Sequence, residues 1–262
     1  MRVIKLTIQY EGTAYVGWQR QKVGISLQGA LESALAEIEG VEVHVVGAGR
    51  TDAGVHALGQ AASVRLQCSI ALPALKRALN AILPRDIRVI SAEEMSHTFN
   101  ARSEARSKTY QYFVMTGSVI SPFERRYVWH VPQPLNVKWM TEAVMLLKGR
   151  HDFSAFQTTG GSVKTTIRTI TEVEVDEVTS AQFLSPMVST ATRSSDSSLL
   201  VFRICGDGFL RHMVRAIVGT LVDIGSGRRT PKNIGKILVS GDRSQAGPTA
   251  PPQGLFLVSV DY

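Results

Sequence analysis

Cysteine is scarce in this sequence. Cys68 and Cys205 are its two cysteines among 262 residues, and neither has another Cys or a His at the spacing of a zinc site. Neither a disulfide framework nor a structural metal is therefore expected. We expect both thiols to be small buried hydrophobic groups.

Long apolar runs are also missing. Apolar stretches such as 78–83 are far shorter than the roughly 18 residues that cross a bilayer. The opening MRVIKLTIQY alternates like a strand and lacks the charged start, apolar block and cleavage site of a signal peptide. These features predict a soluble, cytoplasmic protein without a membrane partner.

Charge and composition favour a folded, basic protein. Residues of the hydrophobic class make up 44% of the chain, which suffices for one large domain or two ordinary ones. Lys and Arg (29) exceed Asp and Glu (22), giving a net charge of +7. This excess favours a polyanionic partner, although many basic proteins bind none.

Hydrophobic periodicity predicts strands separated by helices in both halves of the chain. The expected strands are 3–10, 41–46, 60–66, 87–95, 107–115, 166–175, 199–204 and 255–260. The expected helices are 27–39, 73–83, 137–148, 209–224 and one opened by Thr230 and Pro231. This pattern predicts α+β subdomains with helices packed on a sheet.

The polar, basic segment 99–108 interrupts the apolar pattern and suggests a boundary between halves. We expect an N-terminal α+β subdomain at 1–101 and a C-terminal one at 102–262. The Ser/Thr-rich stretch 177–198 has no sustained periodicity, which predicts a long flexible loop. A site is expected in a cleft between the halves.

The stretch GAGRTDAGVHALGQ, residues 47–60, concentrates glycine around one acid, Asp52. An Asp in such a turn often bonds its own backbone. Asp52 and His56 alone are too few ligands for a metal site, and no Lys-Ser or Lys-Thr follows for a nucleotide-binding loop. The flanking Arg50 and His56 favour a functional role for the acid instead.

Five segments in order along the chain resemble the tRNA pseudouridine synthase A family: YEGTAYVGWQRQ, GRTDAGVHA, RSKTYQYFV, GDGFLRHMVRAIVGTL and GLFLVSVDY. The resemblance implies two related ferredoxin-like α/β halves that form a continuous, mostly antiparallel sheet with a central cleft. It also implies isomerisation of uridine to pseudouridine in the anticodon arm of tRNA, at tRNA positions 38–40. A homodimer, no cofactor and no DNA partner are part of this expectation.

The resemblance assigns catalytic roles to Asp52, Tyr110 and Arg215. A carboxylate can attack the sugar covalently, stabilise a developing positive sugar or transfer a proton, and the sequence does not choose among these. Arg215 is expected to pair with Asp52, and Tyr110 to stack on the uracil. Tyr112 shares the predicted strand face with Tyr110, but a core role is expected for it.

Several further residues are expected to bind the RNA. By resemblance, Arg50 fills the space left by the flipped nucleotide and contacts the RNA backbone. Arg211 lies four residues before Arg215, so both share one face of the predicted helix, where Arg211 either contacts RNA or is solvated. His56 either contacts RNA or braces the turn. Possible phosphate contacts are Lys108, Arg102, Arg106, Arg20 and Lys22.

Two alternatives remain beside this interpretation. One is a pseudouridine synthase for a different RNA, which charge does not exclude. The other is a non-catalytic RNA-binding module, which explains the basic and aromatic residues. It gives no reason for Asp52, because an acid weakens attraction to phosphates.

Overall fold

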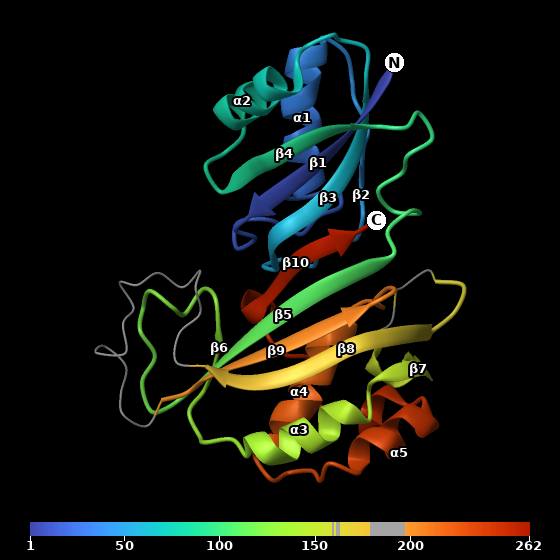
Figure 1. The fold of residues 1–262 in the computed structure, drawn as a ribbon. Helices are drawn as coiled ribbons and strands as arrows, with labels where there is room; N and C mark the ends of the chain where they lie inside the picture. Colours follow the sequence, from blue (N-terminus) through green and yellow to red (C-terminus); the bar gives the residue numbers. More distant parts are fainter. Residues whose placement is uncertain (159, 161–162, 179–196) are drawn as a thin grey trace. The chain divides into compact units, whose positions relative to one another are not determined.

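The computed structural model describes residues 1–158, 160, 163–178 and 197–262 (Figure 1). The chain forms two compact units. The N-terminal unit comprises Met1–Lys108 and Phe256–Tyr262, and the C-terminal unit comprises Thr109–Leu255. These bounds differ from the expected division at 101/102. The last strand belongs to the first unit because it pairs with a strand there.

Antiparallel pairing dominates the sheet of the N-terminal unit. Its strands follow the order β4 (Ile87–Met95), β1 (Arg2–Tyr10), β3 (His56–Leu66) and β10 (Leu255–Asp261), and β2 (Val45–Gly47) also pairs with β3. β10 runs parallel to β3. The helices α1 (Leu27–Glu39) and α2 (Leu72–Ile82) lie on one face of this sheet (Figure 1).

Local sequence signals account for α1. The Ser26 side chain accepts a hydrogen bond from the Gly29 N–H at the helix start. Gly40 ends the helix in the left-handed conformation, with φ of 77°. Leu27, Leu31 and Leu35 are fully buried against the sheet. The predicted helix 27–39 is therefore confirmed at both ends.

The strands of the C-terminal unit follow the order β5 (Ser107–Thr116), β9 (Leu199–Gly206), β8 (Ile167–Val178) and β7 (Gly149–Asp152), with β6 (Trp129–Val131) parallel to β5. The first two residues of β5 belong to the N-terminal unit. The helices are α3 (Val137–Met145), α4 (Met213–Gly225) and α5 (Asn233–Ser240). Nearly every residue of α4 is buried, so it forms the core of this unit.

These observations confirm the α+β class with mostly antiparallel pairing. Several element predictions were wrong at one bound: the strand expected at 60–66 begins at His56, and the helix expected at 137–148 ends at Met145. The strand expected at 41–46 is confined to Val45–Gly47, and the helix expected at 209–224 begins at Met213. For the helix expected at 209–224 the reason is His212, whose left-handed backbone (φ 61°) cannot continue a right-handed helix. Residues 179–196 of the expected loop 177–198 lie outside the described residues.

The two thiols differ in environment. Cys205 is buried, as expected, whereas Cys68 is partly exposed. Partial burial, and then a hydrogen bond to Glu39, raise the pKa of the Cys68 thiol. Within the described part of the chain, no group of His, Cys, Asp and Glu could hold a metal ion.

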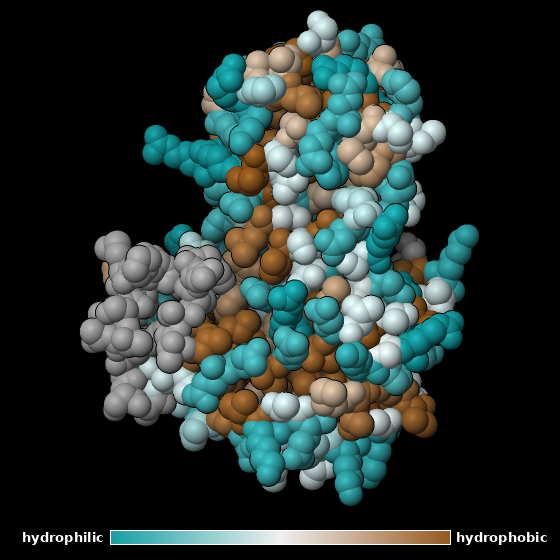
Figure 2. Space-filling model, viewed as in Figure 1, coloured by the Kyte–Doolittle hydropathy of each residue, from teal (hydrophilic) through white to brown (hydrophobic). Residues whose placement is uncertain are grey.

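Hydrophilic side chains are spread over the surface of each unit on the face shown in Figure 2. None of the described helices combines the length and apolar character that a membrane crossing requires.

Candidate active site

Asp52 lies in the loop between β2 and β3 of the N-terminal unit and is half-buried. Its backbone forms an isolated antiparallel bridge with Gly17. The Trp18 N–H donates a 2.9 Å hydrogen bond to the carbonyl of the preceding Thr51. The loop that carries the acid is thus fastened to the segment that follows β1.

Glycine permits this fastening. A Cβ on Gly17, whose φ is 104°, would lie 2.7 Å from the Thr51 carbonyl oxygen. A Cβ on Gly12 would lie 2.0 Å from the oxygen of Val55, and one on Gly47 would lie 2.4 Å from the Trp18 ring. Real Cβ atoms do not approach so closely. The two segments therefore interlock through close contacts at glycine that larger residues would prevent.

A buried polar network supports the same loop. The Tyr10 and Thr51 hydroxyls share a 2.8 Å hydrogen bond, and the Gln60 amide donates a 3.0 Å bond to the Gly49 carbonyl. Burial raises the pKa of Tyr10 above its ordinary value. The sequence analysis missed these supporting residues. The YEG and GRTD motifs contain two of them, and a search for polar groups at core positions of strands would have found Gln60.

His56 begins β3 and is 1% exposed. Its Nδ1 accepts a 3.1 Å hydrogen bond from the Gly12 N–H and lies 3.6 Å from the Glu11 carboxylate. Its ring stacks on Phe256, with 4.6 Å between centroids. Of the two roles considered for His56, these contacts favour bracing the loop.

The cations of the N-terminal unit that are expected to bind RNA differ in their contacts and exposure. The Lys108 side chain packs against Gly49, with Cε 3.4 Å from the position of a Cβ there. Arg20 pairs with the buried Glu32 at 3.5 Å, and its N–H donates to the Gln28 side chain. Arg50, Lys22, Arg102 and Arg106 are exposed.

In the C-terminal unit, the structure separates Tyr110 from Tyr112. The Tyr112 ring is fully buried, and its hydroxyl donates a 2.7 Å hydrogen bond to the Pro251 carbonyl. Tyr110 is 7% exposed and meets the Phe209 ring edge-on at 5.0 Å. Tyr112 is therefore a core residue, as expected.

Arg215 is the third residue of α4 and is half-buried. Its Nε donates a 2.7 Å hydrogen bond to the Ala250 carbonyl, and the Ala250 N–H donates to the Arg215 carbonyl at 3.1 Å. The direction of the guanidinium is thus fixed by the backbone of a second segment. Burial raises the pKa of the nearby Tyr112 hydroxyl, and the Arg215 charge offsets part of that rise.

Arg211 is exposed and precedes α4. The expectation that Arg211 and Arg215 share one helix face was therefore wrong, since the helix starts between them. The Arg211 guanidinium lies against Gly160 instead, 2.7 Å from the position of a Cβ there. Because Gly160 has no side chain, this contact is possible.

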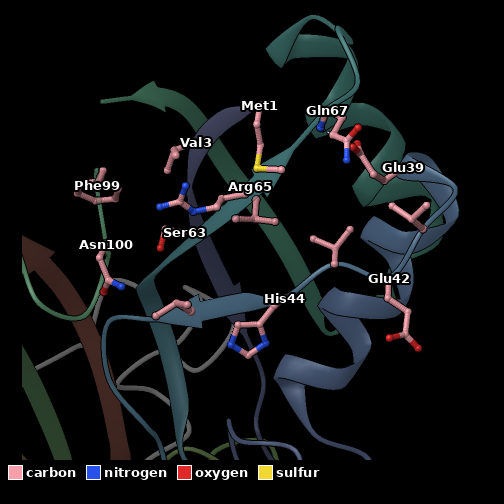
Figure 3. Close-up of a pocket in the computed structure, with 14 residues that line it drawn as sticks. Met1, Val3, Glu39, Glu42, His44, Ser63, Arg65, Gln67, Phe99 and Asn100 are labelled. Carbon is pink, nitrogen blue, oxygen red and sulfur yellow. Dashed lines mark hydrogen bonds between the residues drawn. The ribbon is translucent and has the colours of Figure 1, made fainter. Parts of the chain in front are cut away.

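A cavity of about 230 Å³ in the N-terminal unit lies at the other end of β3 from His56 (Figure 3). Val3, His44, Arg65 and Phe99 are among the residues that line it. None of the residues predicted for the site is among them. The Glu39 carboxylate in its wall already accepts hydrogen bonds from the backbone of the segment after β3. This cavity is therefore separate from the Asp52 loop.

Comparison with known proteins identifies the class. The sequence model of a family described as "tRNA pseudouridine synthase" matches residues 6–102 and 143–262. These ranges contain Asp52 and Arg215, whereas Tyr110 lies outside them. The chain belongs to the tRNA pseudouridine synthase family, so the enzyme class predicted from its motifs is confirmed.

Similar full-length proteins narrow the class further. The chain is 43% identical to tRNA pseudouridine synthase A of Geobacter sulfurreducens and 42% identical to that of Pelobacter propionicus. It is 40% identical to tRNA pseudouridine synthase A 2 of Clostridium perfringens. Each match spans 262 residues and 100% of both chains.

Proposed function

We propose that this enzyme isomerises uridine to pseudouridine in the anticodon arm of tRNA, at tRNA positions 38–40, with Asp52 as the catalytic carboxylate. The reaction breaks the bond between uracil N1 and the ribose C1′, turns the base over and joins C5 to the same carbon. N1 gains a proton and C5 loses one, so the product is an isomer and needs no redox partner. The support is the family match together with the interlocked loop that holds Asp52.

In this proposal three residues have separate catalytic roles: Asp52, Arg215 and Tyr110. The carboxylate acts at the sugar carbon, where positive charge develops as the glycosidic bond breaks. Arg215 offsets the unfavourable burial of that carboxylate when the nucleotide excludes water. Tyr110 stacks on the extruded base, and its hydroxyl offers a hydrogen bond. The Ala250 contact of Arg215 supports such a role, because it leaves the guanidinium little freedom.

In this proposal, cations of both units bind the RNA. Extruding a nucleotide costs a few kcal/mol of unstacking, and Arg50 offsets this by filling the vacated space and contacting the RNA backbone. Lys108, Arg20 and Arg211 contact phosphates, while His56 supports the loop from beneath. Because the enzyme acts on tRNA in this proposal, we also place it in the cytoplasm.

We further propose that the enzyme is a homodimer in which one tRNA contacts both subunits. A single subunit of this size contacts only part of a tRNA. A second subunit would enlarge the surface that binds it. Sedimentation velocity over a range of concentrations decides this point: a persistent monomer of 28.6 kDa would reject the dimer.

Replacing Asp52 with Asn tests the catalytic assignment. We expect Asp52→Asn to abolish pseudouridine formation in tRNA transcripts while tRNA binding is largely kept, because shape and hydrogen bonding survive and the charge does not. Asp176→Asn, on the exposed face of β8, is the matched control and should retain full activity. Thermal unfolding of both variants checks the fold.

Pseudouridine mapping on the products separates the nearest alternatives. Retained activity in Asp52→Asn would reject Asp52 as the catalytic acid. Modification of an RNA outside the anticodon arm would leave Asp52 in place but reject the proposed target. Arg215→Ala should lower turnover strongly, and near-normal turnover with unchanged stability would remove Arg215 from the catalytic residues.

A further inference from the structure

His212 is the one residue other than glycine with a positive φ in the described part of the chain. Its φ and ψ of 61° and 6° place it in the left-handed region. For a residue with a Cβ this conformation costs about 1–2 kcal/mol, and it persists where the surrounding structure enforces it. His212 also forms the boundary between the proposed RNA contact Arg211 and the first turn of α4, which holds Arg215.

Thr158 supplies the enforcing contacts. Its hydroxyl shares a 2.8 Å hydrogen bond with Nδ1 of His212. Its N–H donates a 3.3 Å hydrogen bond to the Arg211 carbonyl. A side-chain bond and a backbone bond thus attach the turn before α4 to one residue, which follows the short helix Ser154–Phe156.

The helix itself gives no reason for Arg215 to stand in its first turn. A cation there is unfavourable, because the unpaired N–H groups carry partial positive charge. The backbone bonds of α4 begin at His212, whose carbonyl accepts from the Ala216 N–H at 2.9 Å. If the chain turned at another residue, the helix would start elsewhere and Arg215 would leave it in a different direction. The bond to Ala250 would then be lost.

We propose that His212 and Thr158 are positioning residues: their hydrogen bond holds the strained turn that sets the start of α4 and thereby aims Arg215. This inference rests on the proposed function, because it assigns this hydrogen-bonded turn a role in turnover. In this proposal neither residue touches the reacting atoms. Their loss should therefore change how well the catalytic groups are placed, and should leave RNA binding largely intact.

Thr158→Val is the sharpest test, because it removes the hydroxyl and nearly preserves shape. We expect kcat for tRNA to fall roughly 10–100-fold, as misplacement of about 1 Å can do, while KM changes less than about twofold. His212→Ala should show a similar loss. The double variant should be little worse than either single one, because both remove the same bond.

Conservative substitutions at the same two positions test whether kcat is preserved. Thr158→Ser keeps the hydroxyl, and His212→Asn keeps a polar side chain on a residue type that tolerates the left-handed region. Both should recover most of kcat. Thr141→Val, on the exposed side of α3, repeats the Thr→Val change away from the turn and should leave kcat unchanged.

A readout independent of activity completes the test. Hydrogen exchange of the Ala216 amide should accelerate in Thr158→Val, since its acceptor is the His212 carbonyl. Unchanged kcat and exchange in Thr158→Val would overturn the positioning role while the proposed function stands. Additive losses in the double variant would also overturn it. If the unaltered enzyme forms no pseudouridine in tRNA, the proposed function fails and the positioning role fails with it.

Discussion

Single residues in this protein show how similar side chains acquire different tasks. Tyr110 and Tyr112 lie on the same strand two residues apart, where alternation places them on one face. Their partners separate them: Tyr112 is bonded to the Pro251 carbonyl in the core, whereas Tyr110 meets the Phe209 ring and keeps some exposure.

We expect Tyr112→Phe to lower the free energy of unfolding by about 0.5–1.5 kcal/mol near neutral pH, the usual net value of one hydrogen bond. Turnover per folded molecule should change little. Tyr110→Phe should do the reverse and lower kcat with little change in stability. Urea unfolding and pseudouridine formation, measured on both variants, check the pair. Equal effects of the two substitutions on kcat would contradict this division.

Tyr112 also predicts a pH dependence. Burial raises its pKa above the ordinary value of 10.0. Above about pH 10 the unfolded chain ionises this hydroxyl while the folded state keeps it protonated, so the free energy of unfolding falls as pH rises. Tyr112→Phe should therefore lose less stability than the unaltered protein between pH 9 and 11. Urea unfolding across that range measures the difference, and parallel curves would contradict it.

At the scale of elements, local signals define helix ends where they are present. α1 has a side-chain cap at Ser26, whereas α2 begins after Ala71, which has an extended backbone and no side-chain cap. The two helices of the N-terminal unit therefore offer a matched pair of sites for testing the capping contribution.

Ser26→Ala should lower the free energy of unfolding by about 1 kcal/mol, because the Gly29 N–H loses its acceptor. Ala71→Ser should raise it, by at most a comparable amount, because it supplies an acceptor to a helix that lacks one. Thermal and urea unfolding measure both changes. A loss of stability in Ala71→Ser would show that its backbone does not suit a cap.

Prediction from sequence succeeded best for elements of this kind. The bounds of helix 27–39 and strand 87–95 were predicted as observed. For the helix, the cap at Ser26, Gly40 and the apolar periodicity all act within the segment. The start of α4 was missed because it depends on His212, whose backbone conformation is held by contacts with Thr158, more than 50 residues away in sequence. The polarity of Thr158 and His212 in the sequence does not indicate that they are in contact.

For the whole molecule, net charge is the property that matters most for an RNA substrate. The chain carries +7, which supports attraction to a polyanion independent of sequence. Each phosphate contact that forms releases counterions, so the affinity for tRNA should fall steeply as salt increases.

We expect Arg50→Gln to reduce the slope of log K against log salt by about 1, the change expected for one lost phosphate contact. Arg203→Gln is the control, because Arg203 is exposed on β9 beside Glu172 and has no proposed RNA contact. Binding is measured with the Asp52→Asn enzyme, so that turnover does not interfere. Equal slopes for both variants would remove Arg50 from the RNA-binding residues.

The sequence by itself determined the α+β class, most element positions and the family, and it singled out Asp52, Tyr110 and Arg215 as candidates. These follow from periodicity, capping and motifs, which are local along the chain. Tertiary structure decided that His56 is buried beneath the loop and that Arg211 precedes α4. Such outcomes depend on which distant backbone atoms meet, and close packing fixes those only once the chain has folded.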